Sequence, residues 1–179
     1  MKKLFGLAIF ALFLTTSVNA QEFKALDKSP LDAVMARNDN DEGLIRVIYS
    51  RPHKKGREIF GNLVPYGKIW RTGANEATEV TFYKDMMVGG KKVPKGAYTL
   101  YTIPNKKEWT IILNKNTNVW GTRGNYKESE DLVRITAPAR QAANTIEDFS
   151  MAFQPMDNGT KLMMGWDDVY VSVPFKNAN

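Results

Sequence analysis

FSMAF, residues 149–153, and VYVSV, residues 169–173, are the stretches that decide the fold of this chain. In the first, Phe149, Met151 and Phe153 alternate with small side chains, so the bulky residues share one face of an extended strand. LVRITA, residues 132–137, and the second stretch alternate in the same way. A period of two is typical of strands that bury one face, so these segments predict a sheet.

Similar short runs recur through most of the chain, without long helical periodicity. Gly89-Gly90 and Asn158-Gly159 are hairpin turn signals, since glycine and asparagine tolerate positive φ. SPLDAVMARN, residues 29–38, is predicted to be a first strand, although Ser29-Pro30 could also cap a short helix. Eight or nine strands joined by tight turns indicate an all-β fold, an antiparallel β-sandwich or a jelly-roll-like arrangement. The remaining predicted strands are residues 44–50, 78–83, 97–103 and 109–114.

The first 20 residues have the pattern of a secretory signal peptide. Lys2 and Lys3 precede an apolar run over residues 4–14, and small residues lead to a predicted cut after Ala20. The run is too short to span a bilayer, and a buried N-terminal helix is the less favoured interpretation. We therefore expect a periplasmic or secreted protein without membrane insertion after cleavage. Residues 21–179 are predicted to form a single β-sandwich domain with its core at about residues 29–174.

Composition excludes several kinds of chemistry. The chain has no cysteine and one histidine, which rules out disulfides, thiolate catalysis and a zinc site with two imidazoles. The phosphate-loop and calcium-loop patterns are not matched, so we expect no cofactor and no metal. The net charge of +6 falls to +4 without the two N-terminal lysines (23 − 19), and charges of both signs are interspersed. That distribution argues against nucleic acid as a partner.

Two stretches interrupt the alternation. Residues 51–76 form a connection of 26 residues, which is too long for an ordinary loop. Its apolar content, including Ile59, Phe60 and Trp70, predicts an ordered loop that lies across the sandwich. Residues 114–131 are similar in kind.

The sequence resembles a known family at this loop. YSRPHKKGREIFGNLVPYGKIWRTGANEAT, residues 49–78, followed by VPKGAYTLYTIP and EWTIILNK, is similar to the secreted bacterial family catalogued as domain of unknown function 2911. The resemblance spans roughly residues 29–174. Because the family has no agreed activity, the resemblance implies no catalytic residue.

WRTGANE, residues 70–76, offers the densest set of candidate site residues. In a binding interpretation, Trp70 stacks on a sugar or another ring, Arg71 and Asn75 donate hydrogen bonds, and Glu76 is an acceptor or an acid/base. In a structural interpretation, Arg71 and Glu76 form an ion pair that holds the loop on the sheet, and Trp70 lies in the core. A glycosidase would need a second carboxylate, for which Asp167 or Asp168 is the candidate.

Other candidates flank this stretch. A cationic run could bind a carboxylate, phosphate or sulfate, although such runs are usually solvated surface. His53 is a further candidate base, or an ordinary loop histidine. The cationic run comprises Arg51, Lys54, Lys55 and Arg57, and the second loop adds Trp120 and Arg123.

Three functions remain open. The first is a module that binds a small molecule, a sugar or an organic anion through residues 51–76. The second is a hydrolase that uses Glu76 with His53 or with another carboxylate. The third is a structural or interaction domain of the cell envelope. We rank them in this order.

Overall fold

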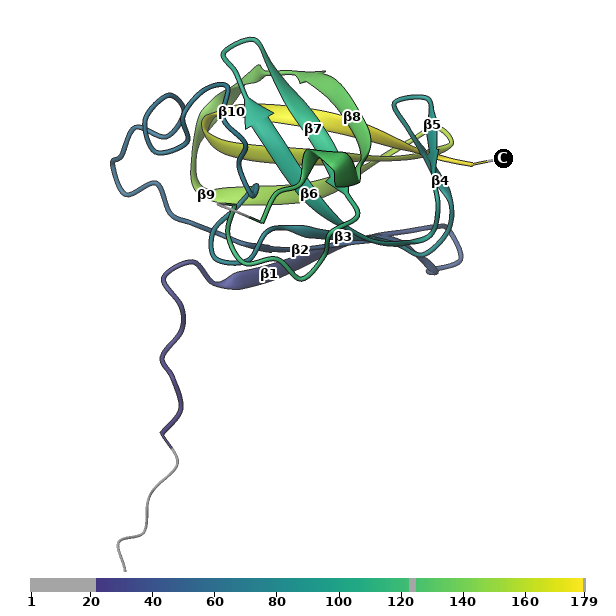
Figure 1. The fold of residues 1–179 in the computed structure, drawn as a ribbon, viewed down its shortest axis with the longest axis horizontal. Helices are drawn as coiled ribbons and strands as arrows, with labels where there is room; N and C mark the ends of the chain where they lie inside the picture. The colour runs from purple at the N-terminus through teal and green to yellow at the C-terminus, as the bar shows by residue number, and fades with distance from the viewer. Residues whose placement is uncertain (1–21, 123–124, 179) are drawn as a thin grey trace, which may run out of the picture.

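A computed structural model describes residues 22–122 and 125–178 of the protein (Figure 1). The predicted signal peptide, its cut after Ala20 and the candidate Arg123 lie outside these residues. No described segment forms a helix long and apolar enough to cross a membrane. A short 3-10 turn, Glu128–Glu130, precedes β8. The strands are β1 Leu31–Arg37, β2 Gly43–Ser50, β3 Glu79–Phe82, β4 Met86–Val88, β5 Lys91–Val93, β6 Gly96–Pro104, β7 Glu108–Asn114, β8 Asp131–Pro138, β9 Arg140–Met156 and β10 Gly159–Asn177.

These strands form two antiparallel sheets. The first sheet has the order β1-β2-β3-β6-β7-β8, and the second has the order β5-β4-β10-β9. The fold is therefore an all-β sandwich, as the alternation predicted. The ambiguous segment at residues 29–38 is a strand, because β1 pairs with β2 from Leu31 opposite Ser50 to Arg37 opposite Gly43.

The last two strands are much longer than the sequence pattern predicted. β9 and β10 extend for 17 and 19 residues, whereas the alternation covers only residues 149–153 and 169–173. Register shifts around Asp167 interrupt their pairing, and the buried positions of β10 change there from even-numbered to odd-numbered residues, which hides the period of two. The short strands β4 and β5 flank the predicted turn at Gly89-Gly90, whose φ angles of 57° and 81° favour glycine.

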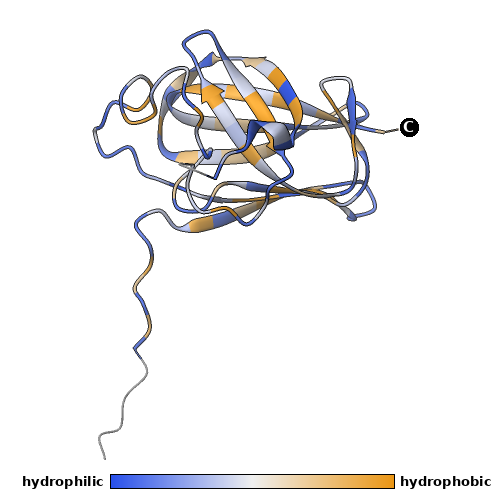
Figure 2. Ribbon diagram, in the orientation of Figure 1, coloured by the Kyte–Doolittle hydropathy of each residue, from blue (hydrophilic) through white to orange (hydrophobic). Residues whose placement is uncertain are grey.

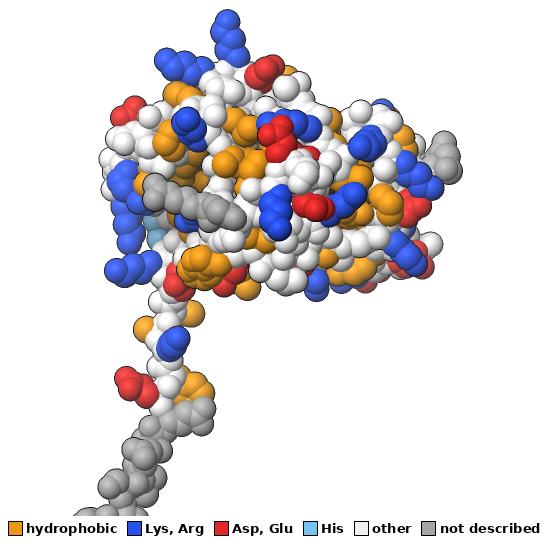
Figure 3. Space-filling view, viewed as in Figure 1, with side chains coloured by type: hydrophobic (Ala, Val, Ile, Leu, Met, Phe, Trp, Pro, Cys, Tyr) orange, Lys and Arg blue, Asp and Glu red, His pale blue; other side chains and the backbone are white. Residues whose placement is uncertain are grey.

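Apolar side chains from both sheets meet between them. Figure 2 shows hydrophobic segments along the strands on either side of this interior. Phe149, Val171 and Val173 are fully buried, in agreement with the predicted inward faces. On the surface seen in Figure 3, basic and acidic side chains are interspersed.

The long loop at residues 51–76 contributes directly to this core. Ile59, Phe60 and Trp70 are buried, and the Trp70 indole is stacked on Trp166 of β10, with ring centroids 6.1 Å apart and planes inclined by 16°. The Trp70 ring also lies 5.0 Å from the ring of Phe149 on β9. The loop is ordered, as predicted, because its aromatic side chains close one end of the sandwich.

A second, smaller core lies on the outer face of the six-stranded sheet. Tyr101 of β6 and Ile112 of β7 point outward and are nevertheless buried. Ala77 and Val119, from the two long loops, cover them, and Tyr126 packs beside them. The two loops therefore meet above this face.

The two loops provide a test of this architecture with one substitution at two tryptophans. Trp70 is 8% exposed and Trp120 is 64% exposed. We expect Trp70→Ala to lower the melting temperature by about 6–20 °C, because truncating a buried tryptophan costs about 3–5 kcal/mol. Trp120→Ala should change stability by less than about 0.5 kcal/mol. Thermal unfolding followed by circular dichroism measures both, and equal losses would contradict the assignment of Trp70 to the core.

Candidate functional site

The stretch at residues 70–78 is a closed backbone loop on the rim of the six-stranded sheet. Trp70 and Thr102 of β6 exchange two backbone hydrogen bonds, at 2.7 and 3.0 Å. The Thr78 amide donates to the Arg71 carbonyl at 3.1 Å, and the Thr78 hydroxyl donates to the Thr72 carbonyl at 2.7 Å. Only glycine fits position 73, since φ is 155° and a Cβ would lie 2.9 Å from the Ser50 carbonyl oxygen.

Trp120 is an exposed side chain on a fixed backbone. The amide of Ala77 donates to Val119 at 2.8 Å and the amide of Gly121 donates to Asn75 at 3.0 Å, so Glu76 and Trp120 stand opposite each other in a short ladder. Strand-like pairing of this kind restrains the backbone that carries the indole. The two long loops therefore present one tryptophan to solvent in a defined place.

One cleft, the Arg71 cleft, lies on one side of Trp120 and has a volume of about 910 Å³. Both long loops form its walls. Its basic side chains are Arg71 and Lys68, and Trp120 and Tyr126 are aromatic. The main lining residues are Leu63, Lys68, Arg71, Trp120, Asn125 and Tyr126.

Arg71 is half-buried in this cleft and has no partner for its charge. Its Nε atom is buried without a hydrogen bond, and within the described residues no carboxylate forms an ion pair with its guanidinium. Burial lowers the pKa of Arg71 from its ordinary value, yet an arginine remains a cation at neutral pH. The structural interpretation, an ion pair between Arg71 and Glu76, is not found among the ion pairs of the described residues, and the two side chains line different clefts.

Tyr126 is fixed in the wall of the Arg71 cleft by a polar network. Its hydroxyl donates to the Asp131 carboxylate at 2.7 Å and accepts from Arg134 at 3.1 Å. Burial, together with the hydrogen bond to Asp131, raises the pKa of Tyr126 to about 12, so the phenol stays neutral. Asn125 is also fixed, because its amide donates to the Trp120 carbonyl at 2.7 Å. These hydrogen bonds hold Tyr126 and Asn125 in place in the wall of the cleft.

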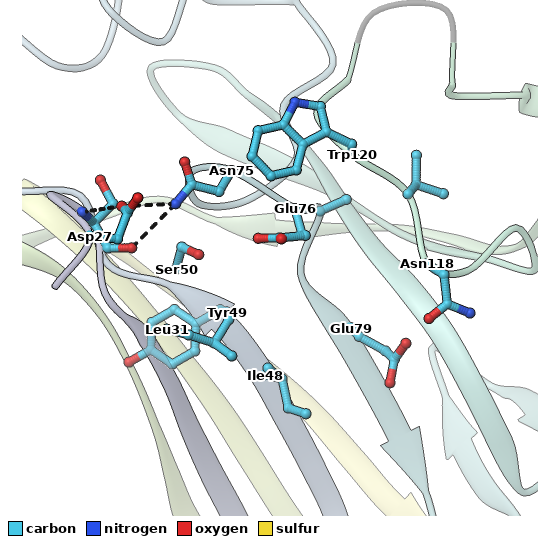
Figure 4. Close-up of a pocket in the computed structure, with 13 residues that line it drawn as sticks. Asp27, Leu31, Ile48, Tyr49, Ser50, Asn75, Glu76, Glu79, Asn118 and Trp120 are labelled. Carbon is cyan, nitrogen blue, oxygen red and sulfur yellow. Dashed lines mark hydrogen bonds between the residues drawn. The ribbon is translucent and has the colours of Figure 1, made fainter. Parts of the chain in front are cut away.

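A second cleft, the Glu76 cleft, lies on the other side of Trp120 and has a volume of about 510 Å³ (Figure 4). In Figure 4, Trp120 stands at one rim, Leu31 and Ile48 lie on the opposite side, and Glu76 projects between them. Glu79, which points outward from β3, adds a second carboxylate.

Asp27 supplies the third carboxylate of this cleft. It accepts a hydrogen bond from the Ser29 amide at 2.7 Å and another from the Asn75 side chain at 3.0 Å. These hydrogen bonds lower the pKa of Asp27. Asn75 is thereby engaged with the N-terminal segment rather than free to meet a ligand.

The predicted cationic run lies elsewhere, along the seam between the long loop and β9. Arg51 donates to Asp32 at 3.1 Å, to the Phe149 carbonyl at 3.2 Å and to the Ser150 hydroxyl at 2.8 Å. The Lys55 amide donates to the Glu147 carboxylate at 2.7 Å.

The other members of the seam are similarly engaged. Arg57 donates to carbonyls of its own loop, those of His53 and Lys54, and the His53 ring contacts Asp148 of β9. The seam fastens the loop to the second sheet.

The structure thus brings together some of the predicted site residues and not others. Arg71 and Glu76 line two clefts that share Trp120. Trp70 is buried in the core and is also among the residues that line the Arg71 cleft, and His53 lines neither cleft. Asp167 is 3.6 Å from Lys54 and Asp168 accepts from Gln141, so neither accompanies Glu76. The described residues contain no group of three or more His, Cys, Asp or Glu side chains placed to hold a metal ion.

Sequence reasoning missed several lining residues. Glu79 lies on a strand whose outward face carries no sequence signal of a cleft, and Asp27 precedes the first strand. Lys68 and Asn125 lie within the two stretches that interrupt the alternation, which was the available signal.

Two arginines of the same loop give a direct test of this assignment. Arg71→Met keeps the aliphatic stem and removes an unpartnered charge, so we expect an unchanged or higher melting temperature. Arg51→Met breaks three side-chain contacts and should cost on the order of 2 kcal/mol, a decrease of about 4–8 °C. Differential scanning calorimetry of both variants checks this, and a large loss for Arg71→Met would show that the residue has a structural partner.

Comparison with known proteins places the chain in a family. No curated protein and no solved structure matches it. The model of the family described as "Protein of unknown function (DUF2911)" matches residues 29–175, which covers the whole sandwich except the ends of the chain. This span includes Trp120 and most of the residues that line both clefts, and it makes up well over half of the sequence. The chain therefore belongs to the DUF2911 family.

Proposed function

We propose that the protein is a periplasmic or secreted module that binds a small anionic ligand in the Arg71 cleft. The observation that carries this proposal is the half-buried, unpartnered guanidinium of Arg71 beside the exposed indole of Trp120. The location rests on the signal-peptide pattern of residues 1–20.

The charge of Arg71 is the first support for an anion. Removing a cation from water is costly unless an opposite charge or hydrogen-bond acceptors compensate it. The lining residues of the cleft include a second cation, Lys68, and no carboxylate. An arginine fork can bind a carboxylate, phosphate or sulfate with two parallel hydrogen bonds. A bound anion would supply the compensation that the described protein groups do not.

The fixed aromatic surface is the second support. Trp120 is 64% exposed and lines the Arg71 cleft, so its indole offers a flat apolar surface on which a ring can stack. Its backbone is already held by the ladder to residues 75–77, so little conformational entropy would be lost when a ring stacks on it. The arrangement suits a ring that carries an anionic group, such as a sugar acid.

Binding is better supported than hydrolysis. His53, Asp167 and Asp168 do not lie in a cleft with Glu76. Glu79 and Asp27 do add carboxylates there, but Asp27 is engaged by Ser29 and Asn75, and Glu76 is exposed, whereas a general acid needs a carboxyl group that burial keeps protonated. Burial of Arg71 and Trp120 together, which a purely structural domain would favour, is not observed.

Titration with matched sugars tests the proposal. By isothermal titration calorimetry, we expect D-glucuronate to bind more tightly than D-glucose, which has the same ring without the carboxylate. Arg71→Gln should weaken glucuronate binding about 10–100-fold, the range expected for a lost charge-assisted pair. Trp120→Ala should weaken both sugars.

Arg57→Gln is the control, because Arg57 is a loop arginine whose guanidinium donates to carbonyls of its own loop. It should leave the affinity for glucuronate unchanged. Equal affinity for the two sugars, or an Arg71→Gln variant that binds glucuronate like the wild type, would overturn the proposal.

A further inference from the structure

The two clefts beside Trp120 carry opposite charge. The residues that line the Arg71 cleft include Arg71 and Lys68 and no acid. Among the described residues, those that line the Glu76 cleft include Asp27, Glu76 and Glu79 and no lysine or arginine. Trp120 lines both clefts, so its indole lies at the boundary between the basic Arg71 cleft and the acidic Glu76 cleft.

We propose that the ligand is dipolar: its carboxylate binds Arg71, its ammonium group binds beside Glu76 and Glu79, and the linker between them crosses Trp120. This inference deepens the proposed function and rests on it for the anionic half. The class includes short peptides and amino-sugar derivatives that carry both charges.

The acidic cleft has the chemistry that recognises an ammonium ion. The face of an indole attracts a cation, and a nearby carboxylate adds a charge-assisted hydrogen bond. Glu76 lies opposite Trp120 in the backbone ladder, which places the carboxylate and the ring in one wall (Figure 4). Asp27 already accepts two hydrogen bonds, whereas Glu76 and Glu79 form no ion pair with any described residue.

The backbone limits the distance between the two charged groups of the ligand. Arg71 and Glu76 are five residues apart, so their Cα atoms can be separated by at most about 18 Å. The hydrogen bond from Thr78 to Arg71 folds this stretch back on itself, which brings the positions closer than that limit. Because the two charged groups line separate clefts that share Trp120, the arrangement favours a ligand whose ammonium and carboxylate are separated by a linker over an α-amino acid, whose charges share one carbon.

A series of ω-amino carboxylates measures this spacing. The probes are chains with a terminal ammonium, a terminal carboxylate and two to ten methylenes, each compared by calorimetry with the alkanoate and the alkylamine of equal length. We expect affinity to pass through a maximum at an intermediate length and to exceed that of both single-charge analogues at least about tenfold there.

Charge-removing variants assign the two ends. Arg71→Gln should abolish the advantage over the alkylamine, and the double change Glu76→Gln with Glu79→Gln should abolish the advantage over the alkanoate. Glu58→Gln, which removes a carboxylate of the same loop outside both clefts, should keep both advantages.

The outcomes separate the two proposals. If alkanoates bind through Arg71 and the added ammonium gives no gain at any length, the dipolar ligand is overturned while the anion-binding function stands. If no carboxylate in the series binds and glucuronate also fails, both proposals are overturned. A gain that survives the double glutamate change would place the ammonium elsewhere and also overturn the inference.

Discussion

The packing of Trp70 against Trp166 and Phe149 is the contact on which the candidate site depends. It converts a 26-residue connection into part of the core, with an indole stacked 6.1 Å from another that is 96 positions away in sequence. Once Trp70 points inward and its backbone is paired with Thr102, the following residue points the other way. Arg71 therefore points into the outer cleft, because the backbone pairing that turns Trp70 into the core turns the next side chain outward.

The loop treats its cations in two different ways. Arg51 contacts Asp32 of β1 and Lys54 contacts Asp167 of β10. Backbone hydrogen bonds hold the short run after β2 along β9. Arg71 receives no such partner among the described residues, although Glu76 is only five positions away. Proteins usually pair a charge that they remove from water. An exception beside a rigid, exposed aromatic ring is what a ligand-binding surface requires before its ligand arrives.

Much of the fold and part of the candidate site could be predicted from the sequence. Alternation in short windows identified the sandwich, and the apolar residues Ile59, Phe60 and Trp70 correctly indicated an ordered loop. The lengths of β9 and β10 were not visible, because irregular pairing near Asp167 interrupts the period. No local pattern distinguishes the buried Trp70 from the exposed Trp120, since that difference depends on β10. Contacts between distant segments are not visible in a local pattern, so the sequence also did not indicate Glu79 as a lining residue. For the same reason an ion pair between Arg71 and Glu76 was plausible from the sequence, although the two side chains line different clefts.

The position of Trp166 near the end of the chain also governs when the molecule can fold during synthesis. Phe60, Trp70 and Phe149 are all made before β10, and they lack the ring that completes their cluster until residue 166 has been added. Contacts this distant in sequence form slowly, because a long segment must close before any packing is gained. The aromatic cluster that anchors the long loop therefore cannot be completed before residue 166 has been made.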